Sequence, residues 1–410
     1  MSTASAPEAG DQSEAWRARR ADVARRQQRG YVERVRAGRG DLSPEGAFEN
    51  DARVYTDPAR FEREMETIFR NQPILVGLTQ DLPEPGSILV FDELEKSIIV
   101  VRTKSGEVRG YLNMCPHRAM MLVEEGCQKK RITCPFHGWT FDLDGNLIGV
   151  PEPEAFENID RAARGLVNVP AAEFAGLIFI LPRAGDDTFD VKDHLGAFAT
   201  ELEQLELQYS EPVKSGALEV DCNWKYALDT YGEAYHFPVL HKENVALFNT
   251  TESLYEPFGP HSRIGWPLRE IAELLDKPES EWPEPAYGGV HYLFPNTIIF
   301  YGSVGAGEPF VQVFRHFPRG VDAMRTHFAV YGRGAVASDE YRAFIETAGY
   351  DGTAHVVETE DYWVAAKGYE RLKAAPSGFK VLYGANELSL TDKHRAIAEA
   401  AQMPLDVYDA

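Results

Sequence analysis

The spacing of hydrophobic and polar positions changes twice along the chain. The first fifty residues are polar, and a helix is expected over residues 15–39. The middle region has short apolar or alternating runs between turn residues, which is typical of an all-β module. The last region alternates helical stretches with strand-like runs. The pattern therefore predicts three parts: a helical arm over residues 1–50, an all-β domain over 51–184 and a second domain over 185–410.

The middle region opens with one short helix, indicated by the spacing of Phe61, Met65 and Phe69. Turn signals at Ser105-Gly106 and Asp144-Gly145 then separate short strands. The expected strands cover residues 88–91, 97–103, 108–113, 166–169 and 177–181.

The last region mixes two kinds of element. A layer of helices packed on an antiparallel sheet is the simplest arrangement that buries both, so an α+β fold is expected. The expected helices cover residues 194–207, 224–237, 338–348, 361–373 and 391–401. The expected strands cover residues 216–221, 290–301, 310–317 and 324–331.

Composition narrows the class of protein. The 410 residues are 44% hydrophobic and 26% charged, as in an ordinary globular protein. A formal net charge of −22 opposes binding to nucleic acid or to an anionic membrane. The sequence shows neither an apolar stretch long enough to cross a bilayer nor a secretory signal, so we expect a cytoplasmic location.

The charge is unevenly distributed. Residues 17–39 contain nine arginines and only two acids, Asp22 and Glu33, so this stretch carries +7 and the remainder −29. An Arg-rich, acid-poor beginning can resemble an organellar transit peptide, but residues 15–39 fit a solvated helix equally well, and we favour the helix.

Two cysteines and two histidines in the β region form one motif. Cys115 and His117 lie in the sequence CPH, and after sixteen further residues Cys134 and His137 lie in CPFHGW. Both thiolates and imidazoles suit zinc or an iron–sulfur cluster, but structural zinc sites usually pair Cys with Cys and His with His. One Cys and one His in each loop favours a [2Fe-2S] cluster with two cysteines on one iron and two histidines on the other. Cys127 lies outside the motif and is expected to be a structural thiol.

A second metal-binding pattern lies in residues 223–241. His236 and His241 are five apart and would be separated by about 140° on a continuous helix. Pro238 interrupts regular helix, so His241 is expected to turn back towards His236. Glu233 and His236, three apart, are expected on one helical face. Two imidazoles plus one carboxylate form the facial triad that holds Fe(2+) for O2 chemistry, so a carboxylate from elsewhere must complete the site.

Both motifs resemble those of the α subunits of Rieske non-heme iron oxygenases. The pattern Cys-x-His-x16-Cys-x2-His is similar to their Rieske domain, and Asn-Trp-Lys followed by Asp-x3-Glu-x2-His-x4-His is similar to their catalytic domain. The resemblance extends from about residue 50 onward. It implies an all-β Rieske [2Fe-2S] domain followed by a mononuclear-iron domain with helices on an antiparallel sheet, in a helix-grip arrangement like that of START and Bet v1 proteins.

The resemblance also assigns roles to individual residues. In that family the third iron ligand lies near the C-terminus in a Glu-Asp pair that opens a helix, so Asp361 is the expected ligand, with Glu358 and Glu360 as alternatives. These acids could instead be favourable charges at a helix N-terminus. Glu233 resembles the residue that links the cluster of one subunit to the iron of the next, here His137 of the partner subunit to His236. Many relatives have Asp at the position of Glu233. The alternative interpretation is that Glu233 is an exposed carboxylate on a helix.

The implied activity is that of a terminal oxygenase. The family uses O2 and electrons from a separate NAD(P)H-dependent reductase, with or without a ferredoxin, and assembles as a homotrimer (α3) or as α3β3. The Gly-rich segment at residues 302–307 has the wrong order for a phosphate-binding loop and is expected to be a hairpin. A Rieske ferredoxin would leave the second half of the chain unexplained. A ligand-binding protein with structural zinc is the other class to exclude.

The substrate is less well specified. We expect mono- or dihydroxylation of a small aromatic or alicyclic molecule, with oxidative N- or O-demethylation as the alternative. Apolar side chains should line the pocket, although each could equally belong to the core. The candidates are Leu228, Phe237, Phe248, Ile298, Phe300 and Phe314.

Overall fold

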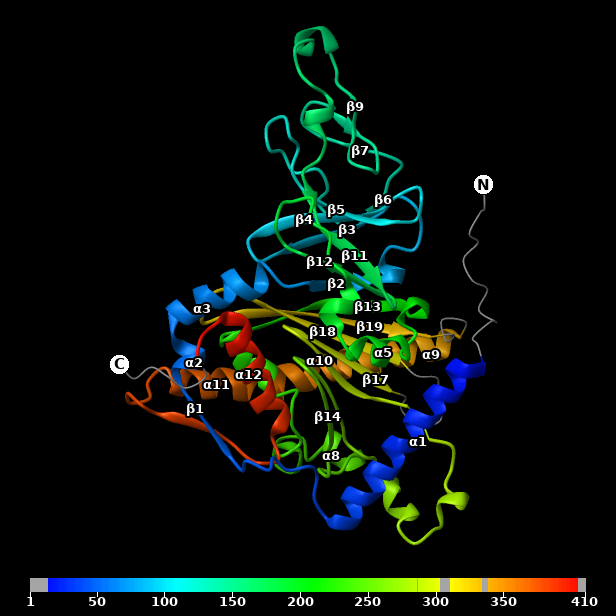
Figure 1. Cartoon of the computed structure of the whole chain (residues 1–410), viewed down its shortest axis with the longest axis vertical. Helices are drawn as coiled ribbons and strands as arrows, with labels where there is room; N and C mark the ends of the chain where they lie inside the picture. The colour runs from blue at the N-terminus through cyan, green and yellow to red at the C-terminus, as the bar shows by residue number, and fades with distance from the viewer. Residues whose placement is uncertain (1–13, 286, 303–309, 334–337, 405–410) are drawn as a thin grey trace.

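The computed structural model describes residues 14–404, except 286, 303–309 and 334–337. A β module lies at one end of the long axis and stands on a larger domain built around one sheet (Figure 1). The α+β fold class, with an all-β domain preceding a domain of helices on an antiparallel sheet, is confirmed. Apart from Gly302, the Gly-rich segment lies outside the described residues.

Three small antiparallel sheets make up the β module. The first has the strand order β10-β5-β4-β3-β6, with strands at Asn168–Val169, Val108–Leu112, Lys96–Arg102, Ser87–Glu93 and Cys127–Gln128. The second has the order β11-β12-β2, at Ala171–Phe174, Leu177–Ile180 and Ile74–Leu78. The third has the order β7-β8-β9, at Ile132–Thr133, Thr140–Phe141 and Leu147–Gly149.

The apolar run in β4 explains the centre of this module. Ile98, Ile99, Val100 and Val101 are all fully buried, because both faces of the strand are covered. Both expected turns have a glycine in the left-handed region, with φ of +89° at Gly106 and +83° at Gly145. A Cβ at these positions would be strained, so glycine sets the chain reversal.

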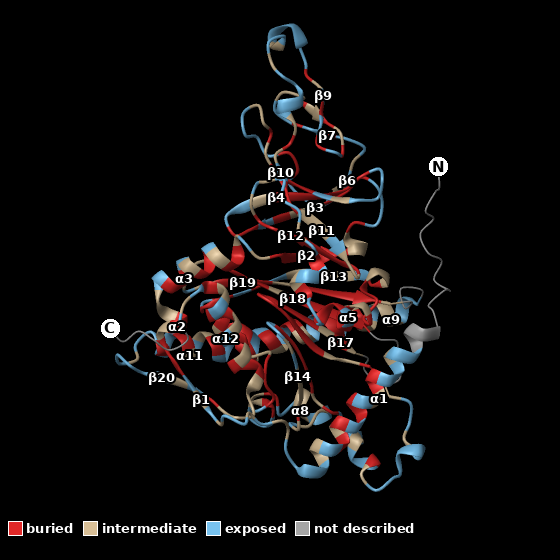
Figure 2. Cartoon of the chain, viewed as in Figure 1, coloured by how far each residue is buried: buried red, intermediate tan, exposed pale blue. Residues whose placement is uncertain are grey.

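The larger domain contains a seven-stranded antiparallel sheet in the order β13-β19-β18-β17-β16-β15-β14. Its strands in chain order are Glu211–Val220, Leu254–Phe258, His261–Gly265, Gly289–Leu293, Thr297–Gly302, Phe310–Pro318 and Met324–Gly332. The single run expected at residues 290–301 is two strands, β16 and β17, because Phe294-Pro295-Asn296 turns the chain between them. One face of the sheet packs against the helices that carry the second motif, and Figure 2 shows the strands buried between layers.

Several expected helices have different limits in the structure. The helix expected at residues 194–207 is two short helices, α4 (Val191–Leu195) and α5 (Phe198–Glu203), separated by Gly196 with φ of +53°. The helix expected from Trp224 to Phe237 ends at Asp229 (α6, Trp224–Asp229). The short helices α7 (Phe237–Leu240) and α8 (Val245–Phe248) follow it, and α12 (Leu388–Ala401) is near the C-terminus.

One long helical segment replaces the two helices expected at residues 338–348 and 361–373. It runs from Asp339 to Leu372 without a break. Its α-helical parts alternate with two π-helical parts: α9 (Asp339–Phe344), η9 (Ile345–Gly352), α10 (Thr353–Val356), η10 (Val357–Asp361) and α11 (Tyr362–Leu372). Asp361 therefore lies inside a helix, and the expectation that it opens one is wrong.

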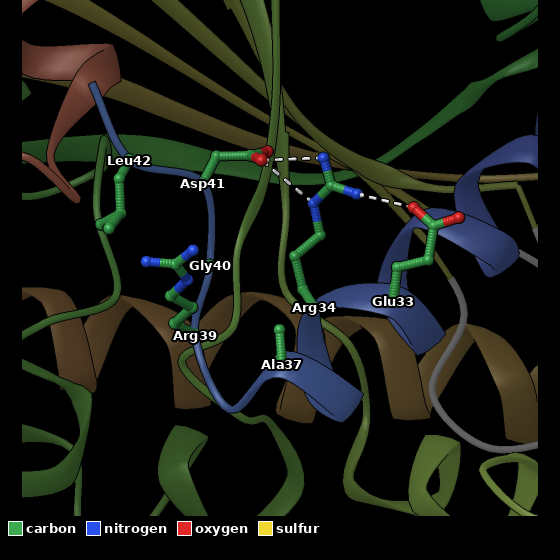
Figure 3. Close-up of a pocket in the computed structure, with 7 residues that line it drawn as sticks. All are labelled: Glu33, Arg34, Ala37, Arg39, Gly40, Asp41 and Leu42. Atoms are coloured by element: carbon green, nitrogen blue, oxygen red, sulfur yellow. Dashed lines mark hydrogen bonds and ion pairs between the residues drawn. The ribbon is translucent and has the colours of Figure 1, made fainter. Parts of the chain in front are cut away.

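The N-terminal arm is helical but docked. Helix α1 (Glu14–Ala37) lies along the edge of the sheet domain beside β14 (Figure 1), and it buries Val23, Ala24 and Val32 on one face. Arg29 pairs with Glu279 at 2.5 Å. At its C-terminal end (Figure 3), the Arg34 guanidinium donates to Asp41 at 2.7 Å. The expectation of a solvated helix is therefore wrong, because several arginines pair with acids of the main body.

Residues 48–69 also pack on the larger domain, although the predicted all-β domain, residues 51–184, includes most of them. Strand β1 (Phe48–Asp51) pairs with β20 (Lys380–Tyr383) near the C-terminus. Helices α2 (Arg53–Thr56) and α3 (Pro58–Glu64), with the π turn η1 (Met65–Phe69), lie beside α12 (Figure 1). Within the described residues, no helix is both long enough and apolar enough to cross a membrane.

A buried histidine on the far side of the sheet predicts a dependence of stability on pH. His261 is 1% exposed; its Nδ1 accepts the N–H of Phe294 at 3.0 Å and its Nε2–H donates to the carbonyl of His194 at 3.1 Å. Burial, together with the neighbouring His194, lowers the pKa of His261 to about 3. Below the unfolded pKa of about 6.5 only the unfolded chain takes up this proton, so the free energy of unfolding falls as the pH drops towards 3.

We therefore expect His261→Gln, which cannot titrate, to lose about 1 kcal/mol less unfolding free energy than the unmodified protein between pH 6 and pH 5. Chemical denaturation at the two pH values measures this difference. The exposed His355 on α10 offers the control, because His355→Gln should leave the pH dependence unchanged. An identical loss in the His261 variant would contradict the assignment.

Candidate cluster and iron sites

The two Cys-His loops of the β module have the same backbone conformation. In the first, the N–H of Ala119 donates to the carbonyl of Cys115 at 2.9 Å; in the second, the N–H of Gly138 donates to that of Cys134 at 3.0 Å. The fourth residue after each cysteine lies in the left-handed region, with φ of +60° at Ala119 and +72° at Gly138. Glycine at the second of these positions therefore has a conformational reason.

These loops bring the four motif side chains together in the β module. Cys115 and Cys134 are buried and form no disulfide, and burial, together with the neighbouring Cys134, raises the pKa of the Cys115 thiol. The rings of His117 and His137 are 4.8 Å apart, and His117 stacks on Trp139 with centroids 4.9 Å apart. The Nδ1 atom of His137 is buried without a hydrogen-bond partner, so it is available to a metal.

Each loop supplies one Cys and one His to this group of donors. Structural zinc sites usually pair Cys with Cys and His with His, so the mixed order suits a two-iron cluster better than a single zinc ion. Cys127, in β6, lies outside both loops.

Helix α6, which precedes the second motif, is fixed at its start by the Asn-Trp-Lys sequence. The side chain of Asn223 accepts the N–H of Lys225 at 3.1 Å and caps the helix. The buried ammonium of Lys225 pairs with Glu64 of α3 at 2.5 Å, and the Trp224 indole donates to the same carboxylate at 3.1 Å. Glu64 carries no metal-ligand signal in the sequence, and its role becomes visible only when α3 is packed on α6.

The segment between α6 and α7 forms a turn around Glu233. This residue is 9% exposed, and its carboxylate accepts the N–H groups of Tyr235 and of His236, the latter at 3.2 Å, as well as a hydrogen bond from Nδ1 of His236. The expected shared helical face is wrong, because the chain is not helical from Gly232 to His236. The contact between Glu233 and His236 comes from the turn.

His236 and His241 flank the single turn of α7. Pro238 lies in the first turn of this helix, where a missing N–H costs little, so the expectation that it interrupts a helix is wrong. His241 ends the helix with φ of −99° and ψ of 26°. His236, at the other end, keeps helical dihedrals, and the two imidazole ring centroids are 4.8 Å apart.

Asp361 approaches both rings from the long helical segment. Its Oδ1 lies 3.7 Å from Nε2 of His236 and 3.4 Å from Nε2 of His241. The Nε2 atom of His236 is buried and has no hydrogen-bond partner. Asp361 is 7% exposed and lies in the π-helical part η10, a distortion that is frequent at functional sites. One carboxylate oxygen and two imidazole nitrogens thus face one point.

Glu360, one of the alternative ligands, has a different place. Its Oε2 accepts Nδ1–H of His241 at 2.6 Å, and its Oε1 accepts from Asn244 at 2.8 Å. The carboxylates of Asp361 and Glu360 together raise the pKa of His241 against the opposing effect of burial. Glu358, the other alternative, is exposed. The sequence offered no signal that distinguishes a residue that orients a ligand from the ligand itself.

The expected pocket residues divide into two groups. Leu228, Phe237, Ile298 and Phe314 are buried, and Phe300 is half-buried on the same face of the sheet. Phe248 is 62% exposed, so its expected place in an interior pocket is wrong. Trp266 was not expected: its ring is 5.0 Å from Phe237, which lies 5.6 Å from His241.

Two protein-family models match this chain. Residues 72–169 match the model of the Rieske [2Fe-2S] domain, and residues 207–402 match that of the ring hydroxylating alpha subunit, catalytic domain. This chain is a Rieske terminal oxygenase α subunit. As an oxidoreductase of that family it uses a [2Fe-2S] cluster and a non-heme iron.

Individual relatives of this Rieske oxygenase act on different molecules. The carnitine monooxygenase oxygenase subunit of Acinetobacter baumannii is 27% identical over 308 residues, which are 74% of this chain and 81% of the relative. The biphenyl 2,3-dioxygenase subunit alpha of Rhodococcus jostii is 33% identical over 194 residues, 45% of this chain and 42% of the relative. A crystal structure of the quaternary ammonium Rieske monooxygenase CntA shares the fold, with a TM-score of 0.73 and 22% identity over 86% of this chain and 95% of CntA.

The contact between Glu360 and His241 generates a prediction. Partners that orient a metal-ligating histidine typically contribute 10- to 100-fold in metal affinity. We expect Glu360→Gln to weaken iron binding to the oxygenase by roughly 10- to 100-fold and to leave the absorption spectrum of the [2Fe-2S] cluster unchanged. Iron titration of apoprotein followed by optical spectroscopy measures both effects.

The matched control is Glu358→Gln on the same helical segment. Its side chain is exposed, so iron affinity should be unchanged. Equal loss of iron in the two variants would mean that the charge of this segment matters and the hydrogen bond to His241 does not.

Proposed function

We propose that His236, His241 and Asp361 hold the mononuclear iron and that Cys115, His117, Cys134 and His137 hold the [2Fe-2S] cluster. The observation that carries the iron assignment is the convergence of three donor atoms of the facial-triad type, two of them fixed by carboxylates on the far side of each ring. When bound, the iron supplies O2 activation and the cluster supplies electrons.

The protein groups have separate tasks around this site. Glu233 and Glu360 accept the Nδ1–H of His236 and His241, which leaves each Nε2 deprotonated and directed inward. The ring of Phe237 lies 5.0 Å from that of His236 and 5.6 Å from that of His241, and Trp266 packs on Phe237 at 5.0 Å. These rings would limit the access of water to the iron ligands. Tyr231 donates to Tyr362 at 3.2 Å next to Asp361, which joins the turn after α6 to the long helical segment.

The substrate we propose is a small quaternary ammonium compound, oxidised at a C–H bond next to nitrogen. The carnitine monooxygenase relative matches along most of the chain, whereas the biphenyl dioxygenase relative matches less than half of it. Aromatic rings such as Phe237 and Trp266 attract a trimethylammonium group through their faces. One oxygen atom of O2 enters the C–H bond and the other leaves as water, with two electrons and two protons consumed. The C–N bond of the hydroxylated ammonium compound then breaks, which releases a tertiary amine, an aldehyde and one proton.

Ring hydroxylation of an aromatic substrate is the second candidate. The biphenyl dioxygenase relative and the apolar interior around Phe314 favour it. The two candidates require different products, so a substrate comparison separates them.

A direct test measures O2 uptake with a reconstituted reductase. Carnitine and other trimethylammonium compounds should stimulate O2 uptake with release of amine and aldehyde, and their neutral analogues with carbon in place of nitrogen should not. Biphenyl should yield no diol. Diol formation from biphenyl, without turnover of any ammonium compound, would replace our proposal by ring hydroxylation.

We also propose that electrons come from a separate reductase, with or without a ferredoxin, and cross between subunits of a homotrimer. In Figure 1 the tip of the β module lies at the opposite end of the molecule from α8. The cluster loops carry exposed apolar side chains, including Phe136 at 52%, and the turn around the proposed iron site exposes Tyr235 at 72% and Val239 at 79%. Contact between these two surfaces of neighbouring copies would bring the cluster close to Glu233.

Mixed oligomers test this arrangement. His117→Ala should remove the cluster and Asp361→Ala the iron, so each variant alone should be inactive. After co-expression in equal amounts, about a quarter of the head-to-tail interfaces join an intact cluster to an intact iron site, so about a quarter of the unmodified turnover should return. No activity in verified mixed oligomers would contradict electron transfer between subunits.

A further inference from the structure

Helix α12 presents two consecutive basic residues to the end of α6. Nε2 of His394 lies 3.0 Å from Oδ2 of Asp229, and Nζ of Lys393 donates to the carbonyl of Leu228 at 3.3 Å. Both basic side chains are buried, with 1% and 2% of their surface exposed. The last carbonyl groups of a helix lack partners within the helix, so donors at this end stabilise it.

Asp229 connects this contact to the N-terminal segment. Its Oδ2 also accepts the hydroxyl of Tyr55 at 2.6 Å. The Tyr55 hydroxyl in turn contacts that of Tyr383 on β20. Two segments that are distant in sequence thus contact the last residue of α6, and β20 supports one of them through Tyr55. The turn that carries Glu233 begins three residues later.

Lys393 fits less easily into a purely structural role. Within the described residues its ammonium has one hydrogen bond and no ion pair, and it lies over the ring of Tyr292 at 5.1 Å. Burial lowers the pKa of Lys393 to about 8, against the opposing charges of Asp229 and Glu233. A buried ammonium with so few partners costs stability, so methionine at this position would be better suited to folding alone.

The ammonium of Lys393 lies directly beside Gly232. A Cβ built at Gly232 would lie 2.6 Å from Nζ of Lys393 and 2.6 Å from Cδ1 of Leu390. The lysine therefore occupies the space beside the residue that immediately precedes Glu233. Any side chain at position 232 would displace either the lysine or the turn.

We propose that Lys393 is a positioning residue for Glu233: it holds the end of α6 and the adjoining turn so that the Glu233 carboxylate meets Nδ1 of His236. The inference rests on the proposed function of Glu233 as the link between cluster and iron. Lys393 acts through the turn and does not touch the donor atoms that face the iron.

The test compares Lys393→Met with the unmodified holoenzyme. Three quantities are measured: the rate at which the reduced cluster is oxidised in a single turnover with O2 and substrate, the exchange of backbone amides in residues 230–236, and the thermal midpoint of unfolding. We expect cluster oxidation to slow about tenfold or more and amide exchange in the turn to rise. Iron content and cluster spectrum should be retained, and the Tm should be unchanged or higher.

Two controls make the outcome specific. Lys367→Met, an exposed position on α11, should change none of the three quantities. Glu233→Gln should slow cluster oxidation without loosening α6. If Glu233→Gln reacts at the unmodified rate, the bridging function of Glu233 is wrong.

Other outcomes would contradict the role of Lys393 without affecting that of Glu233. If Glu233→Gln is slow while Lys393→Met reacts at the unmodified rate with unchanged amide exchange, Lys393 does not position the turn. A lower Tm together with an unchanged rate per bound iron would identify it as a residue that only stabilises the fold. Should Lys393→Met not fold, Gly232→Ala tests the same contact from the other side, because its Cβ would displace either the lysine or the turn, and an unchanged rate there would overturn the proposal.

Discussion

The arrangement of the proposed iron site depends on hydrogen bonds between carboxylates and the outer nitrogens of two imidazoles. Glu233 holds Nδ1 of His236 and Glu360 holds Nδ1 of His241, so both Nε2 atoms face Asp361. A neutral imidazole has one donor and one acceptor nitrogen, and occupation of the donor side decides which nitrogen remains for a metal. Loss of either carboxylate contact would leave its ring free to rotate.

The rest of the larger domain maintains these two contacts. The buried pair of Lys225 and Glu64 fixes the start of α6, and the contacts of Asp229 fix its end. The unbroken helical segment from Asp339 to Leu372 places Glu360 and Asp361 side by side, one against His241 and the other between both rings. The β module carries the second set of donors on two loops of the same backbone conformation, and these loops expose apolar side chains.

The features that could be predicted from the sequence are those determined by residues close together in the chain. The spacing of Cys and His, the β character of the middle region and the fold class could be predicted from neighbouring residues alone. Prediction failed where distant segments decide the geometry. The turn at Glu233 forms because its carboxylate binds backbone N–H groups of Tyr235 and His236, and the π-helical stretch at residues 357–361 has no periodicity that separates it from an α-helix. The docking of α1 depends on acids, such as Glu279, some 250 residues further along the chain.

The central claim is that one polypeptide holds a two-iron cluster and a separate single iron. Combined metal and acid-labile sulfide analysis of anaerobically reconstituted protein tests it most directly. The account predicts about three iron atoms and about two sulfides per chain, as a [2Fe-2S] cluster plus one mononuclear iron require. Stoichiometric zinc without labile sulfide, or an iron content that stays at zero after reconstitution, would contradict it.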